Sequence, residues 1–468
     1  MDGQRRGGGI TGRKRVAMVA LGCAKNLVDG EVMLGRLTRE GHEIVADVEA
    51  ADVVVVNTCG FILDAKQESI DAILEAAALR REGVIERLVV AGCMSQRYAK
   101  ELAAEIPEID TFVGLDELET IGDAVSGRTS GHLPDQRGAL RLYDHTNPRL
   151  LSTGVHAFLK VAEGCDNPCA FCHIPRMRGR FRSRALDDLV AEARALELAG
   201  ARELVLIAQD TTRYGEDIGL DRGLLRLLEV LLGSTGFPWI RVLYAYPATL
   251  DEGLFDLMAA EPRLVPYLDI PFQHASRTVL RAMRRGGSGR TFRALVERAR
   301  GRVPGLTVRT AFIVGHPGEG EAEFEELVEL VEAVRFDHVG VFTYSWQEEN
   351  PGAGLHDPVP AEVKEERRRI LMERQQAIAL EINEALVGRR FPALVEGPLE
   401  EMPLLLRGRL SRHAPEVDGR LLINDGFAET GALVAVEITE AHPYDLVGRI
   451  TGVLDPAPPR PAALPVVG

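Results

Sequence analysis

Residues 163–175 read EGCDNPCAFCHIP and place three cysteines, Cys165, Cys169 and Cys172, in one short loop. The apolar run AFLKVA before the loop predicts a strand. A zinc site takes four ligands, usually from two cysteine pairs, whereas this loop offers three cysteines and no fourth nearby. An iron–sulfur cubane takes one ligand per iron, so three thiolates leave one iron open to a small molecule. The spacing therefore favours such a cluster over a zinc loop completed by His173 or a trio of unrelated buried cysteines.

The segment around this loop, residues 151–387, alternates strand-like runs with helical patterns. This alternation is typical of a parallel sheet with helices packed on it. Six strand–helix units are too few to close an eight-stranded barrel, so we expect an open, partial (β/α)6 barrel. The expected strands are 157–165, 203–210, 240–247, 267–274, 307–315 and 338–346.

Residues 15–126 predict a smaller α/β domain with a Rossmann- or flavodoxin-like parallel sheet. Its three clearest strands end VALGC, VVNTC and VVAGC, so Cys23, Cys59 and Cys93 each end a strand. The carboxyl ends of parallel strands share one edge of a sheet, where ligands bind in open α/β folds. We therefore expect the three thiols to meet and to hold a second cluster. The alternatives are three unrelated buried cysteines or a disulfide, which would leave one thiol over and is disfavoured in the cytoplasm.

The sequence pattern changes from alternating strands and helices to short strands after a charged helix expected at 362–386. From 388 to 455, short strand-like pieces are broken by Gly and Pro, which predicts a small all-β barrel. The expected strands are 392–397, 404–409, 431–439 and 446–454. Outside the domains we expect a disordered Gly- and Arg-rich leader at 1–14, a polar linker at 127–150 and a Pro-rich tail at 456–468.

The composition is that of a soluble globular protein, with 468 residues of which 46% are hydrophobic and 27% charged. The net charge of -15 argues against binding nucleic acid mainly by counterion release and suits a basic protein partner. No apolar run approaches the roughly 18 residues that span a bilayer. The apolar stretch 16–21 after Arg13 and Lys14 is too short for an export signal, which needs about 7–15 apolar residues. We therefore expect a cytoplasmic protein.

The three-cysteine loop resembles that of radical S-adenosylmethionine (SAM) enzymes. The resemblance implies that Cys165, Cys169 and Cys172 hold a 4Fe–4S cluster whose open iron chelates SAM. One electron then cleaves SAM to a 5′-deoxyadenosyl radical, which is the chemistry of the cofactor. Phe171, just before the third cysteine, stands where the family often has an aromatic or polar residue beside the adenine of SAM.

Nearly the whole chain, apart from its two tails, resembles the methylthiotransferase family of radical SAM enzymes. The matching strings are LGCAKNLVDGE at 21–31, NTCGF at 57–61, AGCMSQRY at 91–98 and the segment 163–184, followed by a TRAM-like β-domain. Four strings are similar to the branch that modifies the β-carbon of an aspartate in the twelfth protein of the small ribosomal subunit: 57–70, 207–219, 267–276 and 442–450. Another branch modifies isopentenylated adenosine in transfer RNA.

The charge of the β-domain supports the ribosomal-protein branch. Residues 388–455 contain seven Arg, no Lys and eleven Asp plus Glu, a balance of -4. A domain built to hold transfer RNA should carry a basic face, whereas an acidic one suits a basic ribosomal protein. Arginines clustered on one face of the fold would weaken this inference.

The resemblance also implies a division of roles. A second 4Fe–4S cluster on Cys23, Cys59 and Cys93 would carry the sulfur, one SAM would donate the methyl group, and a second SAM would supply the radical. The partners would be the ribosomal protein and an electron donor such as flavodoxin or ferredoxin, with no membrane and no dominant nucleic-acid contact. The alternatives are the transfer RNA methylthiotransferase and a non-catalytic iron–sulfur scaffold.

SAM should lie across the carboxyl ends of the barrel strands, where the active sites of such folds gather. No catalytic side chain beyond the cluster ligands is assigned. A Gln or His at a strand end has a structural role as often as a binding role. Arg182 and Arg184 either hold the SAM carboxylate or solvate the start of a helix. The candidate SAM contacts are Phe171, Arg182, Arg184, Gln209, Asp210, Gln273, His274, Arg309, Gly315 and Gly318.

Overall fold

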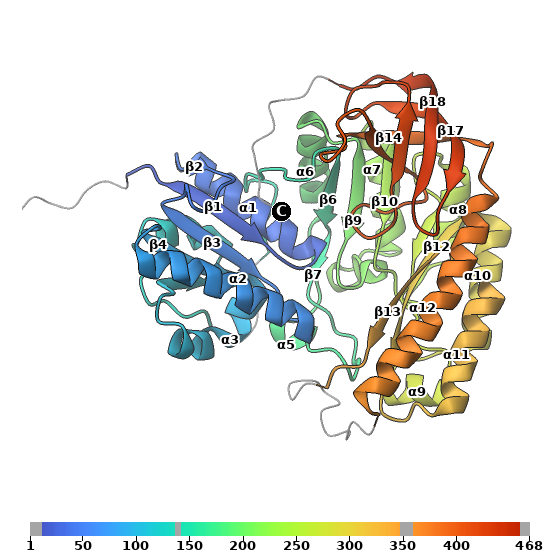
Figure 1. The fold of residues 1–468 in the computed structure, drawn as a ribbon, viewed down its shortest axis with the longest axis horizontal. Helices are drawn as coiled ribbons and strands as arrows, with labels where there is room; N and C mark the ends of the chain where they lie inside the picture. Colours follow the sequence, from blue (N-terminus) through green and yellow to red (C-terminus); the bar gives the residue numbers. More distant parts are fainter. Residues whose placement is uncertain (1–11, 136–141, 347–358, 459–468) are drawn as a thin grey trace, which may run out of the picture. The chain divides into compact units, whose positions relative to one another are not determined.

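The structure, a computed structural model, describes residues 12–135, 142–346 and 359–458 (Figure 1). The chain divides into two compact units. Of the described residues, unit 1 contains those up to Ser152 together with Arg176–Gly179, and unit 2 contains the rest. The leader and tail predicted from the sequence fall mainly on 1–11 and 459–468, which lie outside the described residues. None of the helices in the described ranges is long and apolar enough to span a membrane.

Unit 1 is built on a five-stranded parallel sheet with strand order β2-β1-β3-β4-β5. This order is flavodoxin-like, as the sequence predicted. The sequence also indicated β1, β3 and β4, but it missed β2 and β5, which are two and three residues long and show no periodicity. The strands are β1 Arg15–Ala20, β2 Glu43–Ile44, β3 Val53–Thr58, β4 Arg87–Ala91 and β5 Thr111–Val113.

Helices cover both faces of this sheet, which explains why β3 is a continuous run of valines. Successive side chains of a strand point to opposite faces. Val53 and Val55 accordingly join one apolar core with α1 and α4, and Val54 and Val56 join another with α2 and α3. A strand buried on both faces loses the usual alternation of apolar and polar residues. The helices of unit 1 are α1 Ala24–Arg39, α2 Leu63–Glu82, α3 Gly92–Glu105, η1 Leu118–Thr120 and α4 Ile121–Val125.

Unit 2 contains the partial barrel predicted from the sequence. Its six parallel strands form two three-stranded sheets, β10-β9-β6 and β11-β12-β13. The backbone joins the two sheets where Ala245 N, just after β10, donates to Asp269 O of β11 at 2.9 Å. A short antiparallel pair, β7 with β8, brackets the cysteine loop. The strands are β6 His156–Lys160, β7 Ala162–Glu163, β8 Arg182–Ser183, β9 Glu203–Ile207, β10 Trp239–Val242, β11 Tyr267–Asp269, β12 Thr307–Val314 and β13 His338–Thr343.

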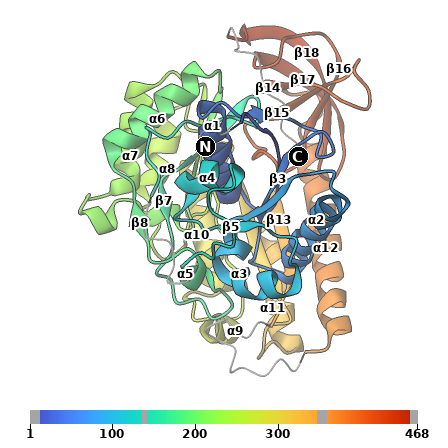
Figure 2. The ribbon, with the colours of Figure 1, turned by 90° about the vertical axis from the view of Figure 1, so that its left-hand side faces the viewer.

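Helices follow most of these strands and pack outside them. Figure 2 shows α6, α7 and α8 together on one flank of the barrel. In Figure 1, α12 lies beside α11 and runs towards the C-terminal β-domain. The helices are α5 Ile174–Met177, α6 Leu186–Leu198, η2 Thr211–Arg213, η3 Glu216–Ile218, α7 Gly223–Ser234, α8 Gly253–Ala260, α9 Arg277–Ala282, α10 Gly289–Arg302, α11 Glu321–Val334 and α12 Ala361–Glu384.

The C-terminal β-domain is a closed five-stranded barrel with strand order β14-β15-β16-β18-β17. The sequence indicated four of its strands. It missed β16, whose five residues follow a charged turn and keep only a short alternation of buried side chains. The strands are β14 Arg390–Pro398, β15 Leu406–Leu410, β16 Leu421–Asp425, β17 Leu433–Ala441 and β18 Leu446–Asp455.

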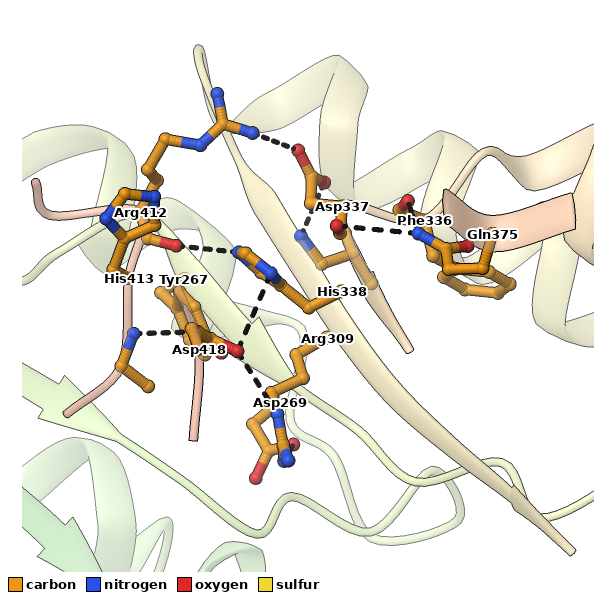
Figure 3. A network of polar contacts seen from close by, with 12 residues as sticks. Tyr267, Asp269, Arg309, Phe336, Asp337, His338, Gln375, Arg412, His413 and Asp418 are labelled. Carbon is orange, nitrogen blue, oxygen red and sulfur yellow. Dashed lines mark hydrogen bonds and ion pairs between the residues drawn. The ribbon is translucent and has the colours of Figure 1, made fainter. Parts of the chain in front are cut away.

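A buried polar contact joins this β-domain to the partial barrel within unit 2 (Figure 3). Asp418, in the loop between β15 and β16, accepts a hydrogen bond from Tyr267 Oη at 2.6 Å. The same carboxylate lies 3.5 Å from Arg309 Nε and 3.6 Å from His338 Nδ1. Tyr267 and His338 are the first residues of their strands, so the loop covers the amino-terminal end of the barrel, opposite the carboxyl ends.

A second buried contact between the same two parts centres on Glu203, the first residue of β9. Its carboxylate lies 2.6 Å from Arg241 Nε and 2.6 Å from Arg409 Nη2 of the β-domain. Burial opposes its ionisation, but the two guanidinium groups outweigh this effect and lower the pKa of Glu203 from 4.5 to about 2. A buried charge is tolerated only when it is paired, so these contacts hold the two barrels together.

We expect Glu203→Gln to lower the free energy of unfolding by about 3–5 kcal/mol at pH 7, because Arg241 would stay buried without its carboxylate. The contribution of an ionised Glu203 is complete above its unfolded pKa and is lost as the pH falls through 4.5 towards 2. Urea unfolding at several pH values should therefore show the variant and the wild type converging in acid. Glu437→Gln is the control, since Glu437 also pairs with two arginines, Arg390 and Arg449, but at the surface. A loss as large in this control would contradict the account.

Candidate functional site

The loop after β7 gathers the cysteines of the CxxxCxxC motif. Its backbone turns back on itself, with Cys172 N donating to Cys169 O at 3.2 Å. Asn167 N donates to Cys165 Sγ at 3.4 Å, and Arg285 Nη1 lies 3.6 Å from Cys169 Sγ. Two of the thiols are buried and Cys172 is half-buried. The loop therefore presents three sulfurs with backbone and cationic donors around them.

The electrostatics of these thiols suit a positively charged iron cluster. Burial raises the pKa of Cys165 to about 11 and that of Cys172 to about 12, and the neighbouring sulfurs contribute to both shifts. Bound iron would offset this effect of burial, since a coordinating thiol is deprotonated outright. Across the described residues, no three Cys, His, Asp or Glu side chains lie close enough to hold a single metal ion. That spacing is compatible with a cubane, because a cubane binds each cysteine through a different iron and so holds the cysteine sulfurs farther apart than a single ion does.

Two candidate SAM contacts at the end of β9, Gln209 and Asp210, form hydrogen bonds near this loop. Asn167 Nδ2 of the loop donates to Asp210 Oδ2 at 2.8 Å, and burial raises the pKa of Asp210. Gln209 Nε2 donates to Glu163 Oε1 at 2.7 Å, and Lys160 Nζ donates to the other oxygen of Glu163 at 2.7 Å. The end of β9 is therefore fastened to the cysteine loop by hydrogen bonds.

A second group of candidates lies after β11 and β12, around the buried carboxylate of Glu319. His274 Nε2 lies 3.2 Å from Glu319 Oε2, and Gly315 N donates to the same oxygen at 2.8 Å. Arg367 of α12 donates to the other oxygen at 2.9 Å. Glu319 thus shapes the glycine loop, in which Gly315 and Gly318 both have positive φ.

Five more candidates occupy defined structural positions. Arg309 forms ion pairs with Asp269 and Asp418 (Figure 3). Arg184 pairs with two carboxylates of α6 and donates to Lys160 O. Arg182 begins β8, Phe171 is half-buried in the cysteine loop, and Gln273 adopts a left-handed backbone conformation with φ of 73°. The SAM contacts assigned to all ten candidates stay predictions.

The sequence missed two residues beside the cysteine loop. Arg285 approaches Cys169 and stacks over the ring of Tyr246 with a guanidinium-to-centroid distance of 4.3 Å. Tyr246 follows β10, where the aromatic string YAYP was a signal, but Arg285 lies between α9 and α10 with no pattern to mark it. The pair places a cation and an aromatic ring at the carboxyl edge of the barrel.

The other three cysteines meet at the carboxyl edge of the sheet in unit 1. Cys23, Cys59 and Cys93 come after β1, β3 and β4, which are neighbours in the sheet. Gly22 has φ of 96°, and a Cβ there would lie 2.7 Å from Cys59 Cβ. A Cβ on Gly92 would lie 2.6 Å from Thr58 O. The two glycines therefore allow the cysteine loops to approach one another.

These thiols also influence one another electrostatically. Burial raises the pKa of Cys93 to about 12, with smaller contributions from Cys23 and Cys59. Cys23 as a residue is exposed to solvent, but the protein atoms around its thiol still oppose ionisation. The positive charges of Lys25 and Arg178 outweigh that effect and lower the pKa of Cys23. As in the other set, closely placed thiols beside cations fit ligands of a cluster.

The fold and the three-cysteine loop define a radical SAM enzyme. The chain matches the Radical SAM superfamily over 159–331, the TRAM domain over 387–451 and the Uncharacterized protein family UPF0004 over 15–114. Its fold is similar to that of TsrM, a radical SAM methyltransferase from Kitasatospora setae solved with cobalamin and a 4Fe–4S cluster bound. The two are 16% identical, with a TM-score of 0.53 and 73% of this chain and 74% of that chain covered.

More similar relatives identify the branch. The ribosomal protein uS12 methylthiotransferase RimO of Anaeromyxobacter sp. (strain K) is 50% identical over 455 residues, covering 96% of each chain. The protein of the same name from Myxococcus xanthus is 46% identical over 463 residues, covering 97% of this chain and 96% of that one. The chain belongs to the ribosomal protein uS12 methylthiotransferase family.

We expect Gly22→Ala to prevent binding of the cluster predicted at Cys23, Cys59 and Cys93, because the new Cβ would separate the loops that carry Cys23 and Cys59. Iron after anaerobic reconstitution should fall from about eight to about four atoms per chain, as expected for the loss of one of two cubanes. Gly41→Ala is the matched control, since Gly41 has φ of 90° but a Cβ there would meet no atom within 4 Å. Equal iron loss in both variants would show that backbone strain, and not the approach of the cysteine loops, is responsible.

Proposed function

We propose that this chain methylthiolates the β-carbon of an aspartate in ribosomal protein uS12. The observation that supports it most strongly is the presence of two sets of three thiols, each at the carboxyl edge of its own parallel sheet. Membership of the uS12 methylthiotransferase family supports the substrate. Overall, one β-hydrogen of the aspartate is exchanged for a methylthio group. One SAM donates the methyl group and leaves as S-adenosylhomocysteine. A second SAM takes up one electron and the hydrogen atom and leaves as 5′-deoxyadenosine and methionine, while the sulfur would come from the cluster of unit 1.

The residues of the chain divide this work between the two units. Cys165, Cys169 and Cys172 would hold a 4Fe–4S cluster, which when bound supplies the electron that cleaves SAM. The set in unit 1, Cys23, Cys59 and Cys93, would hold the cluster that carries the sulfur. Around the first set, Asn167 and Asp210 fix the loop against β9. Around the second, Gly22 and Gly92 keep the loops close.

The ion pairs of the β-domain support a protein substrate over transfer RNA. Five of the seven arginines of 388–455 lie beside carboxylates, with Arg390 and Arg449 sharing Glu437, so their charge is partly neutralised. Binding a phosphate backbone relies on unneutralised Lys and Arg. An acidic domain instead complements a basic ribosomal protein. These charges therefore do not favour the transfer RNA reaction, and membership of the family does not favour the non-catalytic scaffold.

We place this reaction in the cytoplasm, where small-subunit proteins are made, with an electron donor such as flavodoxin or ferredoxin. The acidic net charge of -15 suits a protein that meets basic ribosomal components and not a membrane or nucleic-acid surface.

Replacing each cysteine set by alanine should separate SAM cleavage from attachment of the methylthio group. With Cys165, Cys169 and Cys172 replaced, we expect no 5′-deoxyadenosine on reduction with SAM and no methylthio group on uS12. With Cys23, Cys59 and Cys93 replaced, 5′-deoxyadenosine should still form but the methylthio group should be absent. Mass spectrometry of uS12 peptides from a deletion strain that expresses each variant checks the product.

The same experiment tests the alternatives. If uS12 is unmodified in the parent strain and methylthioadenosine disappears from transfer RNA on deletion, the transfer RNA reaction is correct. If the loaded wild-type chain cleaves no SAM on reduction, the chain is a scaffold and the proposal fails.

A further inference from the structure

Arg178 is a buried arginine that links a carboxylate to one of the cysteines of unit 1. Its Nη1 lies 3.1 Å from Asp29 Oδ2, and both side chains are 1% exposed. Its Nη2 donates to Cys93 Sγ at 3.2 Å. Met177, the preceding residue, packs against Cys93 and Leu115 in a small apolar cluster. The guanidinium is therefore held in an enclosed site with one end on a carboxylate and the other on a sulfur.

The two contacts have different physical meanings. A buried guanidinium needs a carboxylate, and Asp29 of α1 meets that need. The hydrogen bond to Cys93 is additional, because the ion pair with Asp29 already balances the buried charge of Arg178. Guanidinium is planar and presents several donors in a fixed fork, so holding one edge on Asp29 fixes the direction of the other. Asp29 thus aims the donor at the Cys93 sulfur.

We propose that Arg178 is a positioning residue that raises the reduction potential of the cluster held by Cys23, Cys59 and Cys93. The proposal rests on the proposed function only in assigning a cluster to these three cysteines. Hydrogen bonds to the ligand sulfurs, local charge and burial set the potentials of iron–sulfur clusters. A cationic donor at a ligand sulfur favours the reduced state, which carries one more negative charge.

This effect serves the proposed reaction through its electron balance. One electron enters to cleave SAM, and one electron is released when the carbon radical forms its bond to sulfur. A sulfur-carrying cluster with a higher potential accepts that returning electron more readily. Arg178 also follows Cys172 by only six residues. A single segment of the chain therefore supplies ligands for one cluster and a hydrogen-bond donor to a ligand sulfur of the other.

The test measures the midpoint potential of this cluster by electron paramagnetic resonance during a redox titration. The full-length chain carries alanine at Cys165, Cys169 and Cys172, so that only the cluster of unit 1 contributes to the signal. We expect Arg178→Gln to shift the potential downwards, because the charge and the fork are both lost. Arg178→Lys keeps the charge but cannot contact Asp29 and Cys93 together, so its shift should be smaller and in the same direction.

Arg149→Gln is the matched control. Arg149 is also a buried arginine paired with a carboxylate of α1, Glu31, with side chains 4% and 2% exposed. We expect its potential to equal that of the parent chain. A shift in Arg149→Gln as large as that in Arg178→Gln would overturn the proposal, because loss of any buried ion pair would then explain it.

Iron content decides between the remaining outcomes. A parent-like potential in Arg178→Gln with full iron overturns the proposal. If Arg178→Gln holds no iron, the Lys variant decides: a lowered potential supports the proposal, and a parent-like potential overturns it. If the parent chain itself holds no iron at Cys23, Cys59 and Cys93, the proposed function has failed at its second cluster, which is a separate result.

Discussion

The shared edge formed by the carboxyl ends of parallel strands is the constraint on which both candidate clusters depend. In unit 1, cysteines 36 and 34 residues apart in the sequence follow three adjacent strands, and the strand order alone brings them together. Positive φ at Gly22 and Gly92 then lets the loops approach at distances that any side chain would prevent. In unit 2 the cysteines need only one loop, and the strand ends supply the polar side chains around it. The carboxyl ends of parallel strands therefore bring together cysteines that are distant in the sequence in unit 1, and surround cysteines that are close in the sequence in unit 2.

Buried charge organises the rest of unit 2 and affects which substrate it suits. Glu203 and Asp418 bind arginines at the amino-terminal end of the strands, which joins the β-domain to the catalytic fold as one unit. Those pairs, with others at the surface, occupy most of the arginines of the β-domain. A domain of this type that binds RNA needs such side chains for phosphates. Their use in ion pairs therefore links the assembly of the fold to the preference for a basic protein.

Much of the α/β fold was predictable because strands such as β3 and β9 are buried along their whole length and read as uninterrupted apolar runs. The partial barrel, the flavodoxin-like sheet and the small β-barrel were confirmed, whereas β2, β5, β8 and β16 were missed because two to five residues carry too little periodicity. The cysteine sets were visible as strand endings. Arg178 was not, because its partners Asp29 and Cys93 are 149 and 85 residues away and only tertiary structure joins them. Arg309 and Arg184 were predicted to contact SAM, which stays a prediction. Both also form ion pairs, Arg309 with Asp269 40 residues away and Arg184 with Asp188 one helical turn away.

We propose that the six cysteines form two separate three-thiolate sites, each of which leaves one iron without a protein ligand. Iron anomalous scattering from crystals of the anaerobically reconstituted chain tests it most directly. We predict two groups of iron density, one bonded to the sulfurs of Cys23, Cys59 and Cys93 and the other to those of Cys165, Cys169 and Cys172, with no fourth protein ligand in either. Iron at only one set, or a fourth protein side chain closing either cluster, would contradict the account.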